Sequence, residues 1–238
     1  MTFQTRVDRL VNSLDLYAKI EPLIGFDEQY EKLYQIYLEW LKSLHVKTVL
    51  DVGCGNGKFL KHLQKSGFKA QGIERSEHMV ERSLLLGVEA STQELSQLPQ
   101  NSFDCVVAIA DVLNYISPDE LRAFFEQVSG VLKQGGYFLC DVNTLHGFEN
   151  VADGVLSKEN DELFLCVEAN FDNKQLQTHI TLFEKKGDLY HKEQGSITQY
   201  FHSQTFLKKV GIFKFCTTKS VSLFGRESDK TIMLLQKK

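Results

Sequence analysis

Residues 48–57 read Thr-Val-Leu-Asp-Val-Gly-Cys-Gly-Asn-Gly, and residues 72–74 read Gly-Ile-Glu. In each stretch an apolar run meets a carboxylate, Asp51 in the first and Glu74 in the second, and a glycine-spaced turn follows the first run. This layout is typical of a nucleoside-binding β-α-β unit, in which glycines allow a sharp turn and a close approach of the backbone to the ligand. A carboxylate at the end of the second strand is suited to accept hydrogen bonds from both ribose hydroxyls.

The spacing of the glycines helps to distinguish a dinucleotide ligand from other nucleoside ligands. Gly53, Gly55 and Gly57 follow the pattern Gly-x-Gly-x-Gly, whereas dinucleotide-binding proteins carry Gly-x-Gly-x-x-Gly. Asp51 precedes the first glycine by two residues, where it would repel a pyrophosphate and attract a cationic group. The sequence therefore disfavours a nicotinamide-dependent oxidoreductase and favours a nucleoside ligand that carries a positive charge.

Three motifs resemble the class I S-adenosylmethionine-dependent methyltransferases. Residues 49–57 resemble the first motif of that family, residues 102–107 its fourth-strand motif, and residues 131–137 its Val-Leu-Lys-Pro-Gly-Gly turn, with Gln134 in place of the proline. Residues 141–143 and 190–200 resemble a subgroup of small methyltransferases that has an antiparallel insertion after the fifth strand. The resemblance implies S-adenosylmethionine as the cofactor and S-adenosylhomocysteine as its product.

The order of apolar patterns predicts the α/β fold class. Apolar strands are expected at residues 47–52, 69–73, 88–91, 103–109 and 137–141, with helices at 58–66, from Ser76 to about Leu86, and from Ser117 or Asp119 to Lys133. Alternation of such strands with helices predicts a parallel sheet with helices on both faces. The resemblance adds a Rossmann-like, seven-stranded, mostly parallel sheet with a reversed last strand, plus a small antiparallel β insertion.

The same patterns divide the chain into three parts. Residues 1–46 are expected to form an N-terminal cap of two helices, interrupted at Pro22 and Gly25. Residues 47–145 and 203–238 are expected to form the S-adenosylmethionine-binding methyltransferase domain. Residues 163–200 alternate between apolar and polar and contain turn signals, which predicts an antiparallel meander. The resemblance implies that residues 146–202, which contain this meander, form a lid over the substrate.

The resemblance also implies a set of cofactor-binding residues. Asp51 would meet the ammonium group, Glu74 the ribose hydroxyls, and Glu94 the adenine amine. The complete set is Asp51, Gly53, Cys54, Gly55, Gly57, Glu74, Arg75, Met79, Glu94, Leu95 and Ala110. The family often carries a Tyr-Asp pair near the cofactor, and the matching place here reads Ile20-Glu21-Pro22, which leaves Tyr17 or Tyr30 as a cover for the cofactor.

Two residues are candidates for catalysis. Asp111 follows the fourth strand, where it could orient the acceptor or take a proton, although a solvated loop acid is the plainer interpretation. His146 lies just past the fifth strand. Further candidates, none with a partner spacing that singles it out, are Tyr115, Asn143, His191, Tyr200 and His202. A general base is needed only if the acceptor must lose a proton before or during attack.

Composition narrows the partners and the location. The 238 residues carry a formal net charge of -4, which gives no electrostatic reason to expect nucleic acid. Five scattered cysteines without a Cys-x-x-Cys pair predict reduced thiols and no structural zinc. No apolar signal core or run of membrane-spanning length is evident, so we expect a cytoplasmic protein, either a monomer or a homodimer.

These observations favour methyl transfer by in-line attack to a nitrogen, oxygen or carbon nucleophile of a small-molecule acceptor. Two alternatives stay open. A tRNA or protein methyltransferase would need a basic rim, for which the available residues are Lys208, Lys209, Lys214, Lys219 and Arg226. A catalytically silent S-adenosylmethionine-binding protein would keep Asp51 and Glu74 without turnover. No motif identifies the acceptor.

Overall fold

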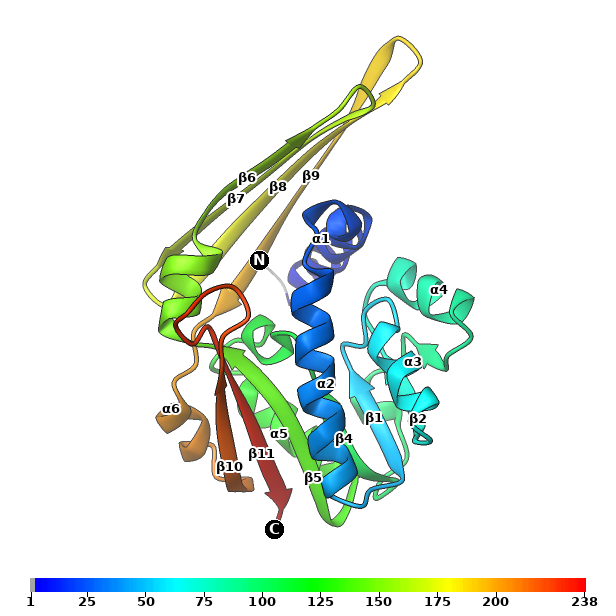
Figure 1. Ribbon diagram of the computed structural model, residues 1–238, viewed down its shortest axis with the longest axis vertical. Coiled ribbons are helices and arrows are strands. Elements are labelled where there is room, and N and C mark those ends of the chain that lie inside the picture. Colours follow the sequence, from blue (N-terminus) through cyan, green and yellow to red (C-terminus); the bar gives the residue numbers. More distant parts are fainter. Residues whose placement is uncertain (1–2) are drawn as a thin grey trace.

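The computed structural model describes residues 3–238, with side chains from Ser13 onward. A seven-stranded sheet with helices on both faces (the main sheet) forms the body of the molecule, and a four-stranded sheet (the upper sheet) extends from it (Figure 1). The helices are α1 (Phe3–Ile24), α2 (Asp27–Ser43), α3 (Lys58–Lys65), α4 (Glu77–Leu85), α5 (Leu121–Val131) and α6 (Gln204–Lys209). Three short turns of helix are η1 (Leu95–Gln97), η2 (Val112–Tyr115) and η3 (Gly147–Ala152).

The main sheet has the strand order β10-β11-β5-β4-β1-β2-β3. Its strands are β1 (Thr48–Val52), β2 (Lys69–Ile73), β3 (Ala90–Ser91), β4 (Phe103–Ala108), β5 (Leu132–Asn143), β10 (Phe213–Val221) and β11 (Lys230–Lys237). Pairs among β1 to β5 are parallel, whereas β11 runs antiparallel to both β5 and β10. The predicted α/β class and the seven-stranded, mostly parallel sheet are therefore confirmed.

Two apolar layers sandwich the main sheet. Successive residues of a strand face opposite sides, so Val49 packs in the layer that contains α2 and α3, and Leu50 packs in the layer that contains α5. Tyr37 of α2 and Phe125 of α5 are fully buried in these two layers. Figure 1 shows α2 crossing one face of the sheet while α5 lies behind it. The layers hold the strands rigidly, so their carboxyl ends form one fixed edge.

Helix α1 runs past Pro22 to Ile24, so the predicted interruption at Pro22 is wrong. A proline inside a helix frees the carbonyl four residues before it, which here is the carbonyl of Ala18. Arg82 Nη1 donates a hydrogen bond to that carbonyl at 2.6 Å, and this bond replaces the missing helical one. The chain breaks instead at Gly25, whose φ is +84°.

Other predicted boundaries also differ from the structure. The strand expected at residues 137–141 begins at Leu132, because α5 ends at Val131 and the backbone extends directly from there. The expected turn at residues 134–136 is a local irregularity within β5, where Gly135 has a φ of +73° and the register with β4 shifts. The strand expected at residues 88–91 is reduced to the two residues of β3.

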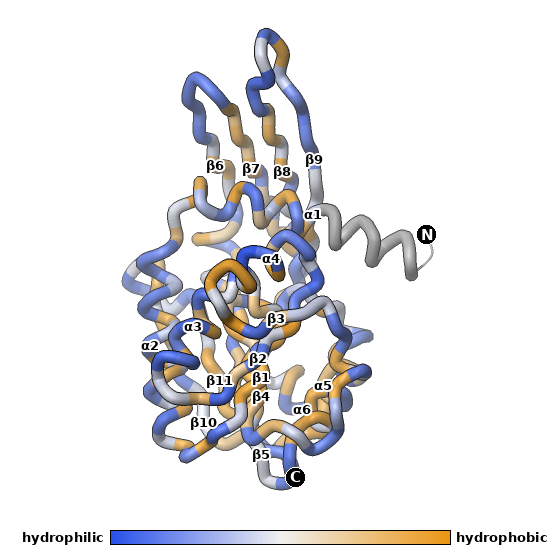
Figure 2. The backbone as a smooth tube through the Cα atoms, turned by 90° about the vertical axis from the view of Figure 1, so that its right-hand side faces the viewer, coloured by the Kyte–Doolittle hydropathy of each residue, from blue (hydrophilic) through white to orange (hydrophobic). Residues whose placement is uncertain are grey.

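The upper sheet is an antiparallel meander in the order β6-β7-β8-β9, which confirms the small antiparallel insertion. Its strands are β6 (Gly154–Glu159), β7 (Leu163–Asp172), β8 (Gln175–Lys186) and β9 (Leu189–Tyr200). Figure 2 shows the strands projecting away from the main sheet, with hydrophilic residues at the tips. The division of the chain into cap, methyltransferase domain and lid stays a prediction.

Helix α1 lies against the inner face of the upper sheet. Leu16 and Ile20 of α1 pack with Leu165, Ile180 and Ile197 of the sheet in an apolar cluster of their own. The contact is close because β9 carries a glycine there, Gly195, at which a Cβ would lie 3.2 Å from the Leu16 side chain. Helix α1 therefore connects the upper sheet to the rest of the molecule.

Candidate functional site

A cavity of about 1020 Å³ lies beyond the carboxyl ends of β1, β2 and β4, under α1 and the upper sheet. Its size is at the upper end of the range of roughly 300–1,000 Å³ that small-molecule sites occupy. The position agrees with the general rule that ligands of parallel sheets bind at the carboxyl ends of the strands, where the strand order reverses. In the main sheet this reversal lies between β1 and β4.

The glycine loop after β1 forms one wall of the cavity. Gly53 and Cys54 donate backbone hydrogen bonds to the Ile73 carbonyl at 2.8 and 3.2 Å, which ties the loop to β2. Gly53 and Gly55 line the cavity and have φ values of +71° and +54°. Gly57 is not a lining residue, and its Cβ would lie 2.6 Å from Ser83 Oγ, so its smallness lets α3 begin against α4.

Asp51 is fully buried beneath this loop and is not part of the cavity wall. Neither of its carboxylate oxygens has a hydrogen-bond partner. Burial raises the pKa of Asp51 well above its ordinary value, and the nearby charge of Glu74 raises the pKa further. An unpartnered buried carboxylate is costly, and a cationic group bound at the loop would offset that cost. The residues present therefore fit a cofactor with an ammonium group.

Glu74 lines the cavity at the end of β2, as the sequence predicts. Its Oε2 accepts a hydrogen bond from the Gly55 amide at 3.0 Å, and its Oε1 accepts from the Arg75 and Ser76 amides at 2.7 and 3.1 Å. The side chain of Ser76 in turn accepts from the Met79 amide and begins α4. These contacts hold the carboxylate against the glycine loop, within the cavity.

The remaining predicted cofactor residues also come together. Met79 and Leu95 contribute buried apolar side chains to the wall. The lining further includes Cys54, Arg75, Glu94 and Ala110. Of the eleven predicted residues, the cavity wall therefore lacks only Asp51, which lies beneath the glycine loop, and Gly57, which ends that loop where α3 begins.

Helices α1 and α2 close this end of the cavity through Tyr17 of α1 and Tyr30 of α2, which the sequence placed only loosely. Tyr17 and Tyr30 both line the cavity, their hydroxyl oxygens lie 3.5 Å apart, and burial raises the pKa of each. Glu21, which sequence reasoning did not assign, accepts a hydrogen bond at 2.8 Å from Asn56 of the glycine loop. The N-terminal helix thus contacts the loop directly.

Asp141, at the end of β5, organises the cavity floor. Its Oδ1 accepts hydrogen bonds from Tyr37 Oη at 2.7 Å and from the Ala110 amide at 2.9 Å, and its Oδ2 accepts from the Asp111 amide at 3.1 Å. Ala110 and Asp111 have φ values of +61° and +71°, which are unfavourable for residues with side chains. The buried carboxylate of Asp141 therefore holds a strained corner immediately after β4.

Lys230 is the charged partner of this corner, and sequence reasoning missed it. Its ammonium forms an ion pair with Asp111, donates to Asn143 Oδ1 at 3.0 Å and lies 3.5 Å from Asp141 Oδ2. Burial alone would lower the pKa of Lys230, but the charges of Asp111 and Asp141 outweigh it and raise that pKa. Asp111 and Lys230 both line the cavity. The floor therefore presents a charge-balanced pair of polar side chains.

The structure does not bring His146 to this floor. His146 Nδ1 lies 3.3 Å from Glu227 Oε2, and the residue is not part of the cavity wall. His202 is buried outside the wall, where Nε2 lies 2.9 Å from the Ile116 carbonyl oxygen and burial lowers its pKa. Tyr115 and Asn143, by contrast, do line the cavity. The part played by each residue in binding or catalysis stays a prediction.

Among the residues that the structure describes, we find neither a metal-binding cluster nor a disulfide. No group of three or more His, Cys, Asp or Glu side chains among the residues described could hold a metal ion. All five cysteines are free, and Cys54, Cys105 and Cys140 are buried. Among the helices that the structure describes, none combines the length and apolar character needed to span a membrane.

Comparison with known proteins agrees with this geometry. Residues 49–136 match the family described as a methyltransferase domain. A curated protein of Geobacillus sp. (strain WCH70), named "Putative methyltransferase GWCH70_2453", is 32% identical over 124 residues. That alignment covers 49% of this chain and 50% of the relative, so the chain spans about half the length of the curated relative it matches.

Several solved structures share the fold over nearly their whole length. An S-adenosylmethionine-dependent methyltransferase from Clostridium acetobutylicum ATCC 824 superposes with a TM-score of 0.75 at 21% identity, covering 93% of this chain and 97% of that one. DesVI from Streptomyces venezuelae gives 0.70 at 17% identity, covering 91% and 97%. CalS10, an amino pentose methyltransferase from Micromonospora echinaspora, gives 0.67 at 15% identity, covering 94% and 97%.

The chain therefore has the class I methyltransferase fold, and the resemblance inferred from its motifs is confirmed.

Proposed function

We propose that this protein is an S-adenosylmethionine-dependent methyltransferase whose acceptor is a small molecule. The observation that carries the proposal is the pairing of Asp51, buried without a partner, with Glu74 at the cavity wall, on either side of the same glycine loop. When bound, S-adenosylmethionine supplies a methyl group made electrophilic by its sulfonium. The residues of the chain would bind this cofactor and orient the acceptor.

The loop end of the cavity would hold the cofactor. Asp51 would stabilise the ammonium group, directly or through water, and Glu74 would accept hydrogen bonds from the ribose hydroxyls. Met79 and Leu95 would contact the adenine with their apolar side chains, and Glu94 would accept from its amine. The contact between Glu21 and Asn56 would keep α1 in place over the loop.

The floor of the cavity would serve the acceptor. Because a sulfonium is a good leaving group, catalysis would come mainly from holding the nucleophile in line with the methyl group. Asp111 is the best-placed residue to orient that nucleophile or to receive its proton, because its carboxylate lines the cavity and Lys230 fixes its position. His146 stays a weaker candidate, since it pairs with Glu227 outside the wall.

Two observations support a small acceptor. The upper sheet and α1 both contribute to the cavity wall, which leaves a volume suited to a compact molecule. Structural relatives include proteins described as a sugar N-methyltransferase and an amino pentose methyltransferase. The net charge of -4 gives no support to a nucleic acid acceptor. Whether nitrogen, oxygen or carbon is methylated is left open.

Thermal unfolding in the presence of ligands tests the proposed cofactor. S-adenosylmethionine or S-adenosylhomocysteine at a hundred times its dissociation constant should stabilise the folded protein by about 2.7 kcal/mol and raise the melting temperature. NAD at the same concentration should leave the melting temperature unchanged. Stabilisation by NAD alone would contradict the proposal.

A further inference from the structure

One wall of the cavity, at the acceptor end, is mostly apolar. On the upper sheet, the lining residues of β7, β8 and β9 are Val167, Ala169, Leu176, Thr178, Ile180, Ile197 and Gln199, and none of them is charged. They recur at every second position, because alternate residues of a strand face the same side. Strand pairing places Ala169, Thr178 and Ile197 in one row and Val167 beside Ile180 in the next. The wall is therefore a continuous and mostly apolar surface.

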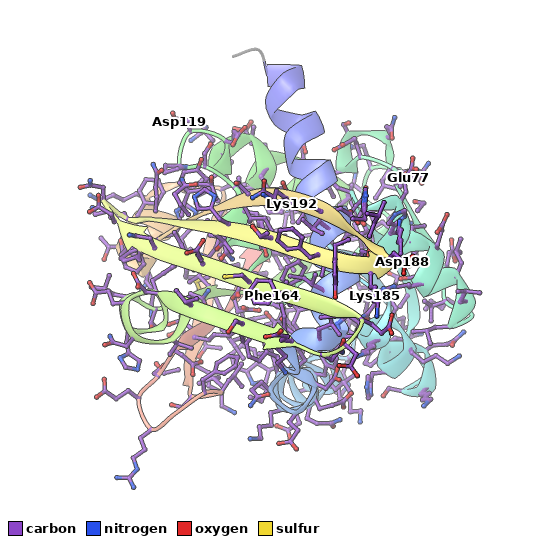
Figure 3. The ribbon with its side chains drawn as sticks, turned by 90° about the horizontal axis from the view of Figure 1, so that it is seen from above. Glu77, Asp119, Phe164, Lys185, Asp188 and Lys192 are labelled. Atoms are coloured by element: carbon purple, nitrogen blue, oxygen red, sulfur yellow. The ribbon has the colours of Figure 1, made fainter. Side chains whose placement is uncertain are left out.

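The opposite face of the same strands is polar, so the apolar character belongs to the cavity side. In Figure 3, Phe164, Lys185 and Lys192 lie on the face that is turned outward, with Asp188 at the tip. The Lys192 ammonium lies 5.6 Å from the centre of the Phe183 ring on that face. A sheet that covers an apolar ligand needs an apolar face toward the ligand and a polar face toward solvent, and the upper sheet has both.

Contacts within the protein hold the carboxylates around this end of the cavity, although Asp229 Oδ1 is buried without a hydrogen-bond partner. Asp153 Oδ2 accepts from the Phe171 amide at 2.7 Å, and Asp229 Oδ2 accepts from the Leu223 and Phe224 amides at 2.8 Å each. The side chain of Glu120 bonds to Ser117. The floor that faces the apolar wall carries the ion pair of Asp111 and Lys230, with Asn143 beside it.

We propose that the chamber bounded by Val167, Ala169, Leu176, Ile180 and Ile197 accepts a small molecule with an apolar body and one polar end, which carries the nucleophile to Asp111. This inference rests on the proposed methyltransferase function. A polyhydroxylated acceptor such as a sugar would place several hydroxyls against a wall that offers only Thr178 and Gln199 as partners, and unpartnered hydroxyls are unfavourable in such surroundings.

The test uses Nile red, a neutral dye that fluoresces in apolar surroundings, with the full chain saturated with S-adenosylhomocysteine. Wild-type protein should bind the dye. Ala169→Asp, which places a charge on the wall, should weaken dye binding by at least about 10-fold. Asn170→Asp is the matched control, because Asn170 is the exposed neighbour and does not line the cavity. Its dye affinity should equal that of the wild type.

Competition then distinguishes the two kinds of acceptor. Tryptamine, which has an apolar body and one amine, should displace the dye at concentrations where glucosamine does not. The proposal is overturned if the saturated wild type binds no dye, if Ala169→Asp and Asn170→Asp bind it equally, or if glucosamine competes as well as tryptamine. Calorimetric binding of S-adenosylhomocysteine to all three proteins is the separate readout: its absence from the wild type would reject the proposed function itself.

Discussion

Lys230 and Asp111 lie 119 residues apart in the chain and form an ion pair at the floor of the cavity, where the Lys230 side chain is only 4% exposed. Asp111 follows β4, Lys230 begins β11, and β5 with its Asp141 and Asn143 lies between those strands. Three neighbouring strand ends therefore contribute to one polar network. The network balances the charge of the only carboxylate that we assign to the acceptor.

Replacement of Lys230 by methionine should strongly destabilise the protein. The substitution removes the ammonium and leaves the carboxylates of Asp111 and Asp141 without their cation, and breaking a buried pair in this way costs about 3–5 kcal/mol. Urea denaturation would measure the loss. The double variant Lys230→Met with Asp111→Asn should recover part of it, because one uncompensated charge is gone. A loss of less than about 1 kcal/mol, as for exposed pairs, would contradict the network.

Cofactor binding should release protons through Asp51. Burial and Glu74 raise the pKa of Asp51 in the free protein, and a bound ammonium would lower it. Between these two pKa values, S-adenosylhomocysteine binding should expel a proton, so the calorimetric enthalpy should vary with the ionisation enthalpy of the buffer. In Asp51→Asn this component of the buffer dependence should vanish. Equal buffer dependence in both proteins would reject the assigned partner of the ammonium.

The same raised pKa predicts how stability depends on pH. Because folded Asp51 holds its proton more tightly than the unfolded chain does, its contribution to stability is complete below the ordinary aspartate pKa and declines as the pH rises through the folded value. In the absence of ligand, wild-type protein should therefore lose stability relative to Asp51→Asn as the pH rises. Denaturation curves at several pH values would measure this difference in stability. A gain of wild-type stability relative to Asp51→Asn as the pH rises would contradict the burial of Asp51.

Asp104 should have the opposite pH dependence. Burial acts to raise its pKa, but hydrogen bonds from Lys133 Nζ at 2.7 Å and from the Thr48 and Lys47 amides at 2.8 and 2.9 Å outweigh it and lower the pKa. Asp104→Asn should cost about 1–3 kcal/mol of unfolding free energy at neutral pH. Since this stability is lost as the pH falls through the folded pKa, the difference from wild type should shrink below about pH 4.

Asp119→Asn is the matched control for that experiment, because Asp119 is exposed at the edge of the molecule (Figure 3). Its unfolding free energy should stay close to that of the wild type at every pH. An equal effect of the two substitutions would show that the contacts of Asp104 do not stabilise the fold.

Gly53 and Gly87 provide a matched pair for the glycine loop. Both have a φ of +71°, so alanine at either position carries a similar backbone strain, of about 1–2 kcal/mol. A Cβ at Gly53 would also lie 2.7 Å from Val112 Cγ2, whereas a Cβ at Gly87 would meet nothing within 4 Å. Gly53→Ala should therefore displace the loop and weaken S-adenosylhomocysteine binding, while Gly87→Ala should lower stability alone. Equal dissociation constants for the two variants would contradict the close fit.

The cofactor end of the site could be predicted from the sequence because its signals are local. Asp51, Gly53 and Gly55 lie within five residues, directly after the apolar pair Val49 and Leu50. Glu74 follows the next strand, and parallel strands bring their carboxyl ends together. Both residues lie where the motif predicts, although the structure adds that Asp51 is behind the loop.

The floor of the site could be predicted only in part: Asp111 and Asn143 are candidates from the sequence, but their contacts depend on tertiary structure. Lys230 is a single lysine before an apolar strand, and no spacing connects it with Asp111. Glu21 and Asn56 are 35 residues apart and meet only through the path of α1. The passage of α1 through Pro22 was predicted wrongly because it depends on Arg82, which lies on another helix.

Calorimetric titration of S-adenosylhomocysteine into three proteins tests the central claim most directly. Wild type and Glu74→Ala form the comparison, and Glu77→Ala is the matched control, since Glu77 is exposed and lies outside the cavity wall. The account predicts micromolar binding by wild type and Glu77→Ala, and binding weakened by at least about 10-fold in Glu74→Ala, which loses a charge-assisted contact to the ribose. Binding of equal strength by Glu74→Ala, or no binding by the wild type, would contradict it.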